Sequence, residues 1–539
     1  MKISGKLVDI HSRDIYPAEI SVNNGIIESI TRIKSAGNHY ILPGLVDAHI
    51  HIESSMVTPG SFARAAVSRG TVAVVSDPHE IANVLGTEGV RYMIRDSKKV
   101  PLKFCFGAPS CVPATSFETS GAMIGPDEIE ELLEKDGLKY LSEMMNYPGV
   151  IYNDPDIRKK IDIARKLNRP VDGHAPGLNG ELLKKYVSAG ITTDHECTTI
   201  KEAREKIALG MKVLIREGSA AKNMNELKEL IRTNPEMVML CSDDLHPEML
   251  ARRHINKLAA QLISEGYDLF DVIRSCTINP VMHYGIEAGL LKPGDPGDFI
   301  ITEDLHSMDI RETWINGEKV YGNGKVLFDY TGSDPVNKFN CSMISAEDIV
   351  IISAGKAIRV IEAFDGALIT KEARMVPEGS GVIDSNIEKD TLKIVVKDRY
   401  NDSPPAAAFI KGFGLKSGAF ASSVAHDCHN IICVGTNDSD IIDAVNEIVK
   451  MKGGLSVADG GSISSLQLPV AGIMSDQPVE KVAAQYEELT ARVKVKGCKM
   501  SAPFMTLSFM ALLVIPELKL SDRGLFDGNK FILVPLFVD

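Results

Sequence analysis

Short apolar runs alternate with longer helical patterns through the middle of the chain, and this alternation limits the possible folds most strongly. Strands that alternate with helices form parallel sheets covered by helices. Roughly 240 residues of this pattern suit a (β/α)8 barrel, for which about 250 residues is typical. We therefore predict an α/β fold with a TIM-type (β/α)8 barrel over residues 43–285, with a doubly wound open sheet as the alternative. The apolar runs are Thr71–Val75, Pro170–His174, Ile191–His195, Met211–Ile215 and Met237–Cys241.

The segments on either side of this barrel both carry β-hairpin patterns. Ile3–Ser35 alternates apolar and polar residues around Asn23-Asn24-Gly25, and Gly297–Val320 contains the turn pair Asn316-Gly317. We predict that residues 1–42 and 286–335 pair into one small β domain. A polar, glycine-containing stretch at 331–340 has the composition of a linker. Mixed strand and helix patterns after it predict a C-terminal α+β domain at 345–539, called the third region below.

Composition narrows the classes of function. The net charge of −13 disfavours nucleic acid as a partner, because phosphates attract basic surfaces. No segment reaches the roughly 18 apolar residues of a membrane span, and the first residues lack a secretory signal pattern. The nine cysteines are scattered without a CxxC pair, as in proteins that keep reduced thiols. We expect a cytoplasmic protein that binds neither nucleic acid nor a membrane.

The strongest local signal is the apolar run Leu42–His51, which ends in His-x-His. Residues two apart on a strand share a face, so His49 and His51 are expected to point inward together. Two imidazoles at the carboxyl end of a barrel strand can bind one metal ion. The alternative is two ordinary histidines at a strand end, but the preceding Pro-Gly-Leu-Val-Asp run favours the metal site.

Further ligand-type residues follow other predicted strands. His174, His195 and Asp243 each stand at the end of an apolar run. Because barrel active sites form at this end of the strands, their recurrence there favours one shared site. A second metal ion would require a bridging carboxylate, and Glu143 lies in apolar surroundings that indicate a buried acid. The alternative for Glu143 is a position on the surface of a helix.

Longer motifs make the chain resemble a known family. Pro43–His51 resembles the first signature of the amidohydrolase superfamily, and further runs resemble the adenine deaminase family within it. Arg253-His254-Ile255-Asn256 departs from the Gly-His-Ile-Asp usual in that family, which leaves the role of this loop in doubt. The resemblance covers nearly the whole chain through the runs His51–Ser55, Asp77–Val84, Asp172–Gly177, Asp194–Thr198, Arg216–Ala220, Ser242–Pro247, Val424–Asn430 and Pro503–Phe509.

The resemblance implies a dinuclear centre of Mn(2+) or Fe(2+). It places His49 and His51 on one ion and His174 and His195 on the other. Glu143 would bridge the two ions in place of the carboxylated lysine of other amidohydrolases, and Asp243 would bind metal and carry the proton. The implied reaction is the hydrolytic deamination of a small-molecule substrate, adenine, to hypoxanthine and ammonia by a metal-bound hydroxide. We also expect a homodimer, the commonest assembly of soluble enzymes.

Other polar residues in these runs are candidates for substrate binding. Glu217 can hydrogen-bond a purine ring nitrogen, or it can form a structural ion pair with Arg216. His79 and Glu80 can line the pocket or hold a further metal ion, or they can only stabilise a loop. Asp244, next to Asp243, is a fourth candidate.

Two histidines of the third region and two rival functions remain open. His426 and His429 can reach the barrel mouth, bind a structural metal ion, or simply pack. One rival function is that of another amidohydrolase, acting on a cyclic amide or a different aminopurine. The other is a metal-binding scaffold without activity. The length of the family motifs and the intact set of six ligand-type residues favour the deaminase.

Overall fold

The computed structural model describes residues 1–219, 221–377 and 381–538. At its centre, the described chain forms parallel strands in hydrogen-bonded groups of five and three. An isolated parallel bridge between Ile50 and Asp243 joins the last strand to the first, which confirms the predicted TIM-type barrel. The strands are β5 (Leu45–Ile50), β6 (Thr71–Ser76), β7 (Lys103–Ala108), β8 (Tyr140–Met144), β9 (Val171–Gly173), β10 (Thr193–Asp194), β11 (Lys212–Arg216) and β12 (Val238–Cys241).

Helices surround the barrel because each presents one apolar face to it. In α6 (Pro155–Lys166), Ile157, Ile161 and Ala164 are buried at helical spacing, and the Asp154 side chain accepts hydrogen bonds from the first turn. Among the described helices, none is long and apolar enough to cross a membrane. The other main helices around the barrel are α1 (Pro59–Val67), α2 (His79–Leu85), α3 (Thr87–Ser97), α4 (Pro126–Glu134), α7 (Gly180–Ser188), α8 (Ile200–Ala208), α12 (Ile255–Ser264), α13 (Leu269–Ser275) and α14 (Ile278–Tyr284).

The two flanks of the barrel meet in one eight-stranded sheet of order β16-β15-β14-β13-β4-β1-β2-β3. Strands β4 and β13 join the flanks, with Leu42 opposite Ile300 in an antiparallel pair. The hairpins predicted at Asn24-Gly25 and Asn316-Gly317 are both present, between β2 and β3 and between β14 and β15. The strands are β1 (Lys2–Asp9), β2 (Asp14–Asn23), β3 (Ile26–Arg32), β4 (Tyr40–Pro43), β13 (Phe299–Thr302), β14 (Ile310–Ile315), β15 (Glu318–Gly322) and β16 (Lys325–Val326).

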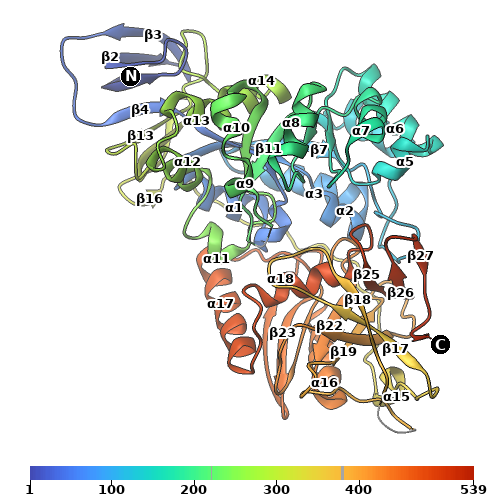
Figure 1. Cartoon of the computed structure of the whole chain (residues 1–539). Helices are drawn as coiled ribbons and strands as arrows, with labels where there is room; N and C mark the ends of the chain where they lie inside the picture. The colour runs from blue at the N-terminus through green and yellow to red at the C-terminus, as the bar shows by residue number, and fades with distance from the viewer. Residues whose placement is uncertain (220, 378–380, 539) are drawn as a thin grey trace.

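The third region forms a second, mostly antiparallel sheet of order β18-β17-β20-β19-β22-β21-β23-β24, with β28 beside β17. Figure 1 shows this region, in orange and red, on the side of the barrel away from β2 and β3. Its elements are β17 (Ala357–Glu362), β18 (Lys371–Met375), β19 (Leu392–Lys397), β20 (Ala406–Lys411), β21 (Ala419–Ser422), β22 (Ile431–Gly435), α16 (Asp438–Met451), β23 (Gly454–Asp459), β24 (Ser462–Gln467), α17 (Val479–Val495), α18 (Pro503–Ser508), η3 (Phe509–Ala511), β25 (Leu518–Ser521), β26 (Gly524–Asp527), β27 (Ile532–Leu533) and β28 (Phe537–Val538).

Contacts between the third region and the barrel lie at the carboxyl end of the barrel strands. The backbone N–H of Thr58, which follows β5, donates to the carbonyl of Ser475 at 3.1 Å. The Asn430 amide donates to the carbonyl of Thr119 at 2.9 Å. The third region therefore covers the end of the barrel at which active sites form. The residue limits proposed for the three units stay predictions.

Candidate metal centre

All six residues predicted as metal ligands meet in one buried cluster at the carboxyl ends of barrel strands. His49 lies on β5 and Glu143 on β8, and the other four lie one or two residues after the ends of β5, β9, β10 and β12. Glu143 is therefore a strand residue with its side chain in the barrel, and the alternative position on a helix surface is excluded. We call this set the metal-ligand cluster: His49, His51, Glu143, His174, His195 and Asp243.

The cluster divides into two groups that share Glu143. In the first, His49 Nε2 and His51 Nε2 lie 3.2 Å apart, and Asp243 Oδ1 lies 3.5 and 3.3 Å from them. Glu143 Oε1 is 3.2 Å from His51 Nε2.

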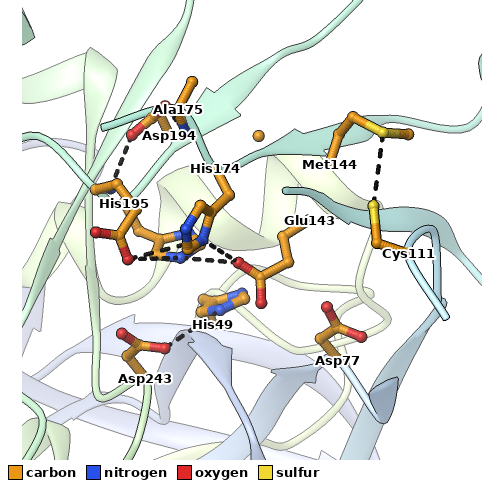
Figure 2. A network of polar contacts seen from close by, with 12 residues as sticks. His49, Asp77, Cys111, Glu143, Met144, His174, Ala175, Asp194, His195 and Asp243 are labelled. Atoms are coloured by element: carbon orange, nitrogen blue, oxygen red, sulfur yellow. Dashed lines mark hydrogen bonds and ion pairs between the residues drawn. The ribbon is translucent and has the colours of Figure 1, made fainter. Parts of the chain in front are cut away.

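In the second group, Glu143 Oε2 lies 2.7 Å from His174 Nδ1 and 3.1 Å from His195 Nε2. Figure 2 shows Glu143 pointing toward these two imidazoles while Asp243 faces His49. One oxygen of this carboxylate thus faces His51, and the other faces His174 and His195.

Most of these spacings suit ligands of a shared metal ion. Two ligand atoms about 2.1 Å from the same ion lie roughly 3.0–3.4 Å apart, and four of the six separations fall in this range, whereas His174 Nδ1 and Glu143 Oε2 lie at hydrogen-bond distance. His49 Nδ1 and His174 Nε2 are buried without a hydrogen-bond partner among the described residues. Mixed imidazole and carboxylate donors are suited to divalent first-row metals. The residues present therefore fit a dinuclear centre.

The charges around the cluster keep both of its carboxyl groups ionised. Burial alone would raise the pKa of Glu143, but the charges of His174 and His195 hold it well below the ordinary value. Burial likewise opposes ionisation of Asp243, and the Arg216 guanidinium and two histidines lower its pKa well below the usual range. Ionised carboxylates are the form that binds metal.

Arg216 fixes the orientation of Asp243. Its guanidinium donates to Asp243 Oδ2. Nη1 and Nη2 also donate to the two carboxylate oxygens of Glu196, at 2.5 and 2.8 Å. Asp243 Oδ1 is left facing the imidazoles. Arg216 is thus engaged away from Glu217, and the predicted alternative of an ion pair between Arg216 and Glu217 is wrong.

The loop Arg253–Asn256, which departs from the family pattern, contacts residues close to His49 and Asp243. His254 Nε2 lies 2.9 Å from Asp47 Oδ2, and the Thr71 hydroxyl is 2.6 Å from His254 Nδ1. Asp47 in turn accepts a 3.0 Å hydrogen bond from the backbone N–H of Ser242. His254 is retained in the departing loop, and it ties the strands that carry His49 and Asp243 together.

A small cavity of about 30 Å³ adjoins the metal-ligand cluster. Three of the four residues predicted to bind substrate line it, namely His79, Glu80 and Asp244, whereas Glu217 is not among its described lining residues. The Ser54 hydroxyl lies 2.9 Å from Glu80 Oε1 and 2.6 Å from Asp244 Oδ1. Ala220, which ends the Arg216–Ala220 run, lies outside the described residues.

The third region supplies one wall of this cavity. Its lining residues there are Leu368, His426, Asp427, Phe509 and Leu512. The His426 and Phe509 rings stack at 4.9 Å with an angle of 20°. His426 thus reaches the barrel mouth, which was one of the alternatives predicted for it. His429, in contrast, is fully buried and is not among the described lining residues.

The sequence analysis did not identify Asp427, Phe509 and Leu368 as site residues, nor Glu196 as the partner of Arg216. Three of the four lie inside motifs that carried the family resemblance, namely Glu196 in Asp194–Thr198, Asp427 in Val424–Asn430 and Phe509 in Pro503–Phe509. The resemblance of those motifs to the family was the feature of the sequence that could have indicated these residues.

Comparison with known proteins agrees with this geometry. The Amidohydrolase family matches residues 40–320, and the Adenine deaminase C-terminal domain matches residues 367–532. An adenine deaminase from Salinibacter ruber (strain DSM 13855 / M31) is 51% identical over 540 residues, covering 100% of this chain and 99% of that relative. An adenine deaminase from Methanosarcina mazei (strain ATCC BAA-159 / DSM 3647 / Goe1 / Go1 / JCM 11833 / OCM 88) is 52% identical over 552 residues, covering 100% of both chains.

Among solved structures, an adenosine deaminase from Xanthomonas campestris with bound zinc matches with a TM-score of 0.46 at 16% identity. The match covers 60% of this chain and 94% of that one. The full-length relatives and the two matched families together confirm the resemblance predicted from the motifs. The chain belongs to the metal-dependent amidohydrolase family of C–N hydrolases and, within it, to the adenine deaminases.

Proposed function

We propose that this chain hydrolyses free adenine at C6 to hypoxanthine and ammonia. The observation that carries the proposal is the position of Glu143 beside a cavity, with one oxygen facing His51 and the other facing His174 and His195. The chain around it is about half identical, over its full length, to proteins named adenine deaminase.

The proposed centre holds two ions of Mn(2+) or Fe(2+). His49, His51 and Asp243 would hold one ion, His174 and His195 the other, and Glu143 would bridge them. When bound, such ions lower the pKa of a coordinated water to about 7 and so supply a nucleophile at neutral pH.

Asp243 is the proposed proton carrier. Its Oδ1 faces the imidazoles of His49 and His51, and Arg216 holds Oδ2, so Oδ1 is the oxygen that would accept and return a proton. A general base that takes the proton of water can afterwards deliver it to the ring or the leaving amine. The apolar wall formed by Leu368, Phe509 and Leu512 keeps bulk water from the reacting atoms.

His79, Glu80 and Asp244 are the proposed substrate-binding residues, because all three line the cavity. The role of Glu217 in substrate binding stays a prediction from the sequence. We further propose a homodimer that acts in the cytoplasm, without a nucleic-acid or membrane partner.

The test is ammonia release by protein expressed with excess manganese. Adenine is assayed beside adenosine, guanine, hydantoin and dihydroorotate. Turnover of adenine alone supports the proposal. Turnover of hydantoin or dihydroorotate, with adenine inert, would instead identify a cyclic amidohydrolase. Two bound ions per chain without turnover of any substrate would favour a metal-binding scaffold.

A further inference from the structure

Asp427 brings a carboxylate from the third region to the active-site cavity. Its side chain is 3% exposed, and it lines the cavity together with the metal ligands. One oxygen, Oδ1, lies 3.7 Å from His79 Nε2 and 3.6 Å from His426 Nδ1. The other oxygen, Oδ2, is buried without a hydrogen-bond partner among the described residues.

A buried carboxylate oxygen without a donor is unusual. Buried polar atoms in native proteins nearly always have a hydrogen-bond partner, in the protein, in ordered water or in a ligand. Asp427 Oδ2 is therefore a free acceptor on a residue that lines the cavity. Because an ionised carboxylate only accepts hydrogen bonds, the group that completes it must carry an N–H or O–H.

Asp427 lies on the far side of His79 from Glu143. His79 lies between the two, with Nδ1 3.5 Å from Glu143 Oε1 and Nε2 3.7 Å from Asp427 Oδ1. A purine whose C6 faces Glu143 directs its five-membered ring away from the metals. In a free base that ring carries an N–H, whereas in a nucleoside the corresponding nitrogen bears the sugar.

Flat and apolar side chains border the same part of the cavity. Phe509 stacks on His426, and Met145 and Leu512 also line the cavity. Aromatic and apolar walls with a few placed polar groups are typical of sites that bind small planar molecules.

The wall is held in place by a buried lysine. Lys519 is fully buried, and its ammonium donates to the carbonyls of Leu368 at 2.6 Å and Phe509 at 2.9 Å. Both acceptor residues line the cavity. The position of this wall is therefore fixed before substrate binds, as specific recognition requires.

From these contacts we infer that Asp427 Oδ2 accepts a hydrogen bond from the N–H of the five-membered ring of adenine and makes the enzyme select the free base. The inference rests on the proposed deaminase function. It means that the third region discriminates between a free base and an N9-substituted base.

The test compares adenine with 9-methyladenine, which lacks this donor, in the wild type and in Asp427→Ala. We expect the wild type to prefer adenine in kcat/KM, and Asp427→Ala to reduce that preference on the order of 10²-fold. The loss should fall on adenine, while 9-methyladenine keeps its rate or gains. Activity on 9-methyladenine also reports that the variant is folded and metal-loaded.

Asp427→Asn is a second variant in case Asp427→Ala misfolds, because asparagine keeps the shape of the side chain and one acceptor oxygen. It should show an intermediate preference. An unchanged preference in both variants, or equal losses on both substrates, would overturn the inference while leaving the deaminase function intact. Wild-type protein inert on adenine would overturn the proposed function, and this inference with it.

Discussion

Lys206 ties together the two loops that carry the second pair of histidines. The ammonium is fully buried on α8 and donates to the carbonyl of Ala175 at 2.8 Å and to Glu202 Oε1 at 2.7 Å. It also lies 3.1 Å from Asp194 Oδ2. Ala175 follows one metal ligand and Asp194 precedes another, as Figure 2 shows. We predict that Lys206→Met both destabilises the barrel and weakens the second metal position.

The magnitude follows from the burial of the ion pair. Burial alone would lower the pKa of Lys206, but Asp194 and Glu202 raise it above the ordinary value, so the charged form is the paired one. Removing one partner of a buried pair costs about 3–5 kcal/mol, because the other charge is left without compensation. This corresponds to roughly two to four powers of ten in the unfolding equilibrium constant.

Lys228→Met provides the matched control. Lys228 pairs with Glu265 at 2.8 Å near the surface, with side chains that are 26% and 34% exposed. Such pairs contribute about 0–1 kcal/mol. Urea unfolding followed by circular dichroism, together with elemental analysis, measures both effects. Equal loss of stability in the two variants, or full metal content in Lys206→Met, would refute this reasoning.

Three further predictions concern the site and its wall. Asp243→Asn should lower kcat by about 10²–10⁴-fold while retaining part of the metal, as measured by ammonia release and elemental analysis. Full activity would exclude Asp243 as the proton carrier. The Glu143→Gln variant should lose at least one of two metal ions per chain. The control variant Glu181→Gln, at an exposed residue, should keep both. Elemental analysis measures the number of ions per chain in each variant.

Burial lowers the pKa of Lys519 to about 7, below the 10.5 of the unfolded chain. The unfolded chain therefore binds one more proton between these values, and the free energy of unfolding rises with pH by about 1.4 kcal/mol per unit. In Lys519→Met, the free energy of unfolding should rise less steeply with pH, by this amount. Urea unfolding at several pH values between 7 and 9 measures the difference from the wild type. An unchanged slope would show that Lys519 is charged in the folded protein across this range.

The parts of the barrel that sequence predicted are those with a strong local pattern. His49 and His51 were predicted to share a face because side chains alternate along a strand. The run Lys103–Ala108, which forms β7, was not among the predicted strands. Its apolar stretch is only Phe104–Phe106 and lies between Lys103 and Gly107, which is too short for its periodicity to identify a strand.

Burial of Glu143 was predicted from its apolar neighbours, but its partners were not predictable from spacing. The carboxylate meets His174 and His195 only because β8, β9 and β10 lie in order around the barrel. The family resemblance supplied that arrangement before the structure. Arg216 shows the limit of local reasoning, since its neighbour Glu217 offered the obvious partner and Glu196 is the actual one.

The wall formed by the third region is the least predictable part of the site, because its contacts with the barrel join residues far apart in sequence. Asp427 meets His79, and Phe509 lines the cavity beside Glu143. No periodicity in either segment indicates that it faces a barrel. The barrel strands hold the metal-ligand cluster, and the third region borders the cavity beside it. We therefore expect substitutions in that wall to change which base is accepted while the metal-ligand cluster stays in place.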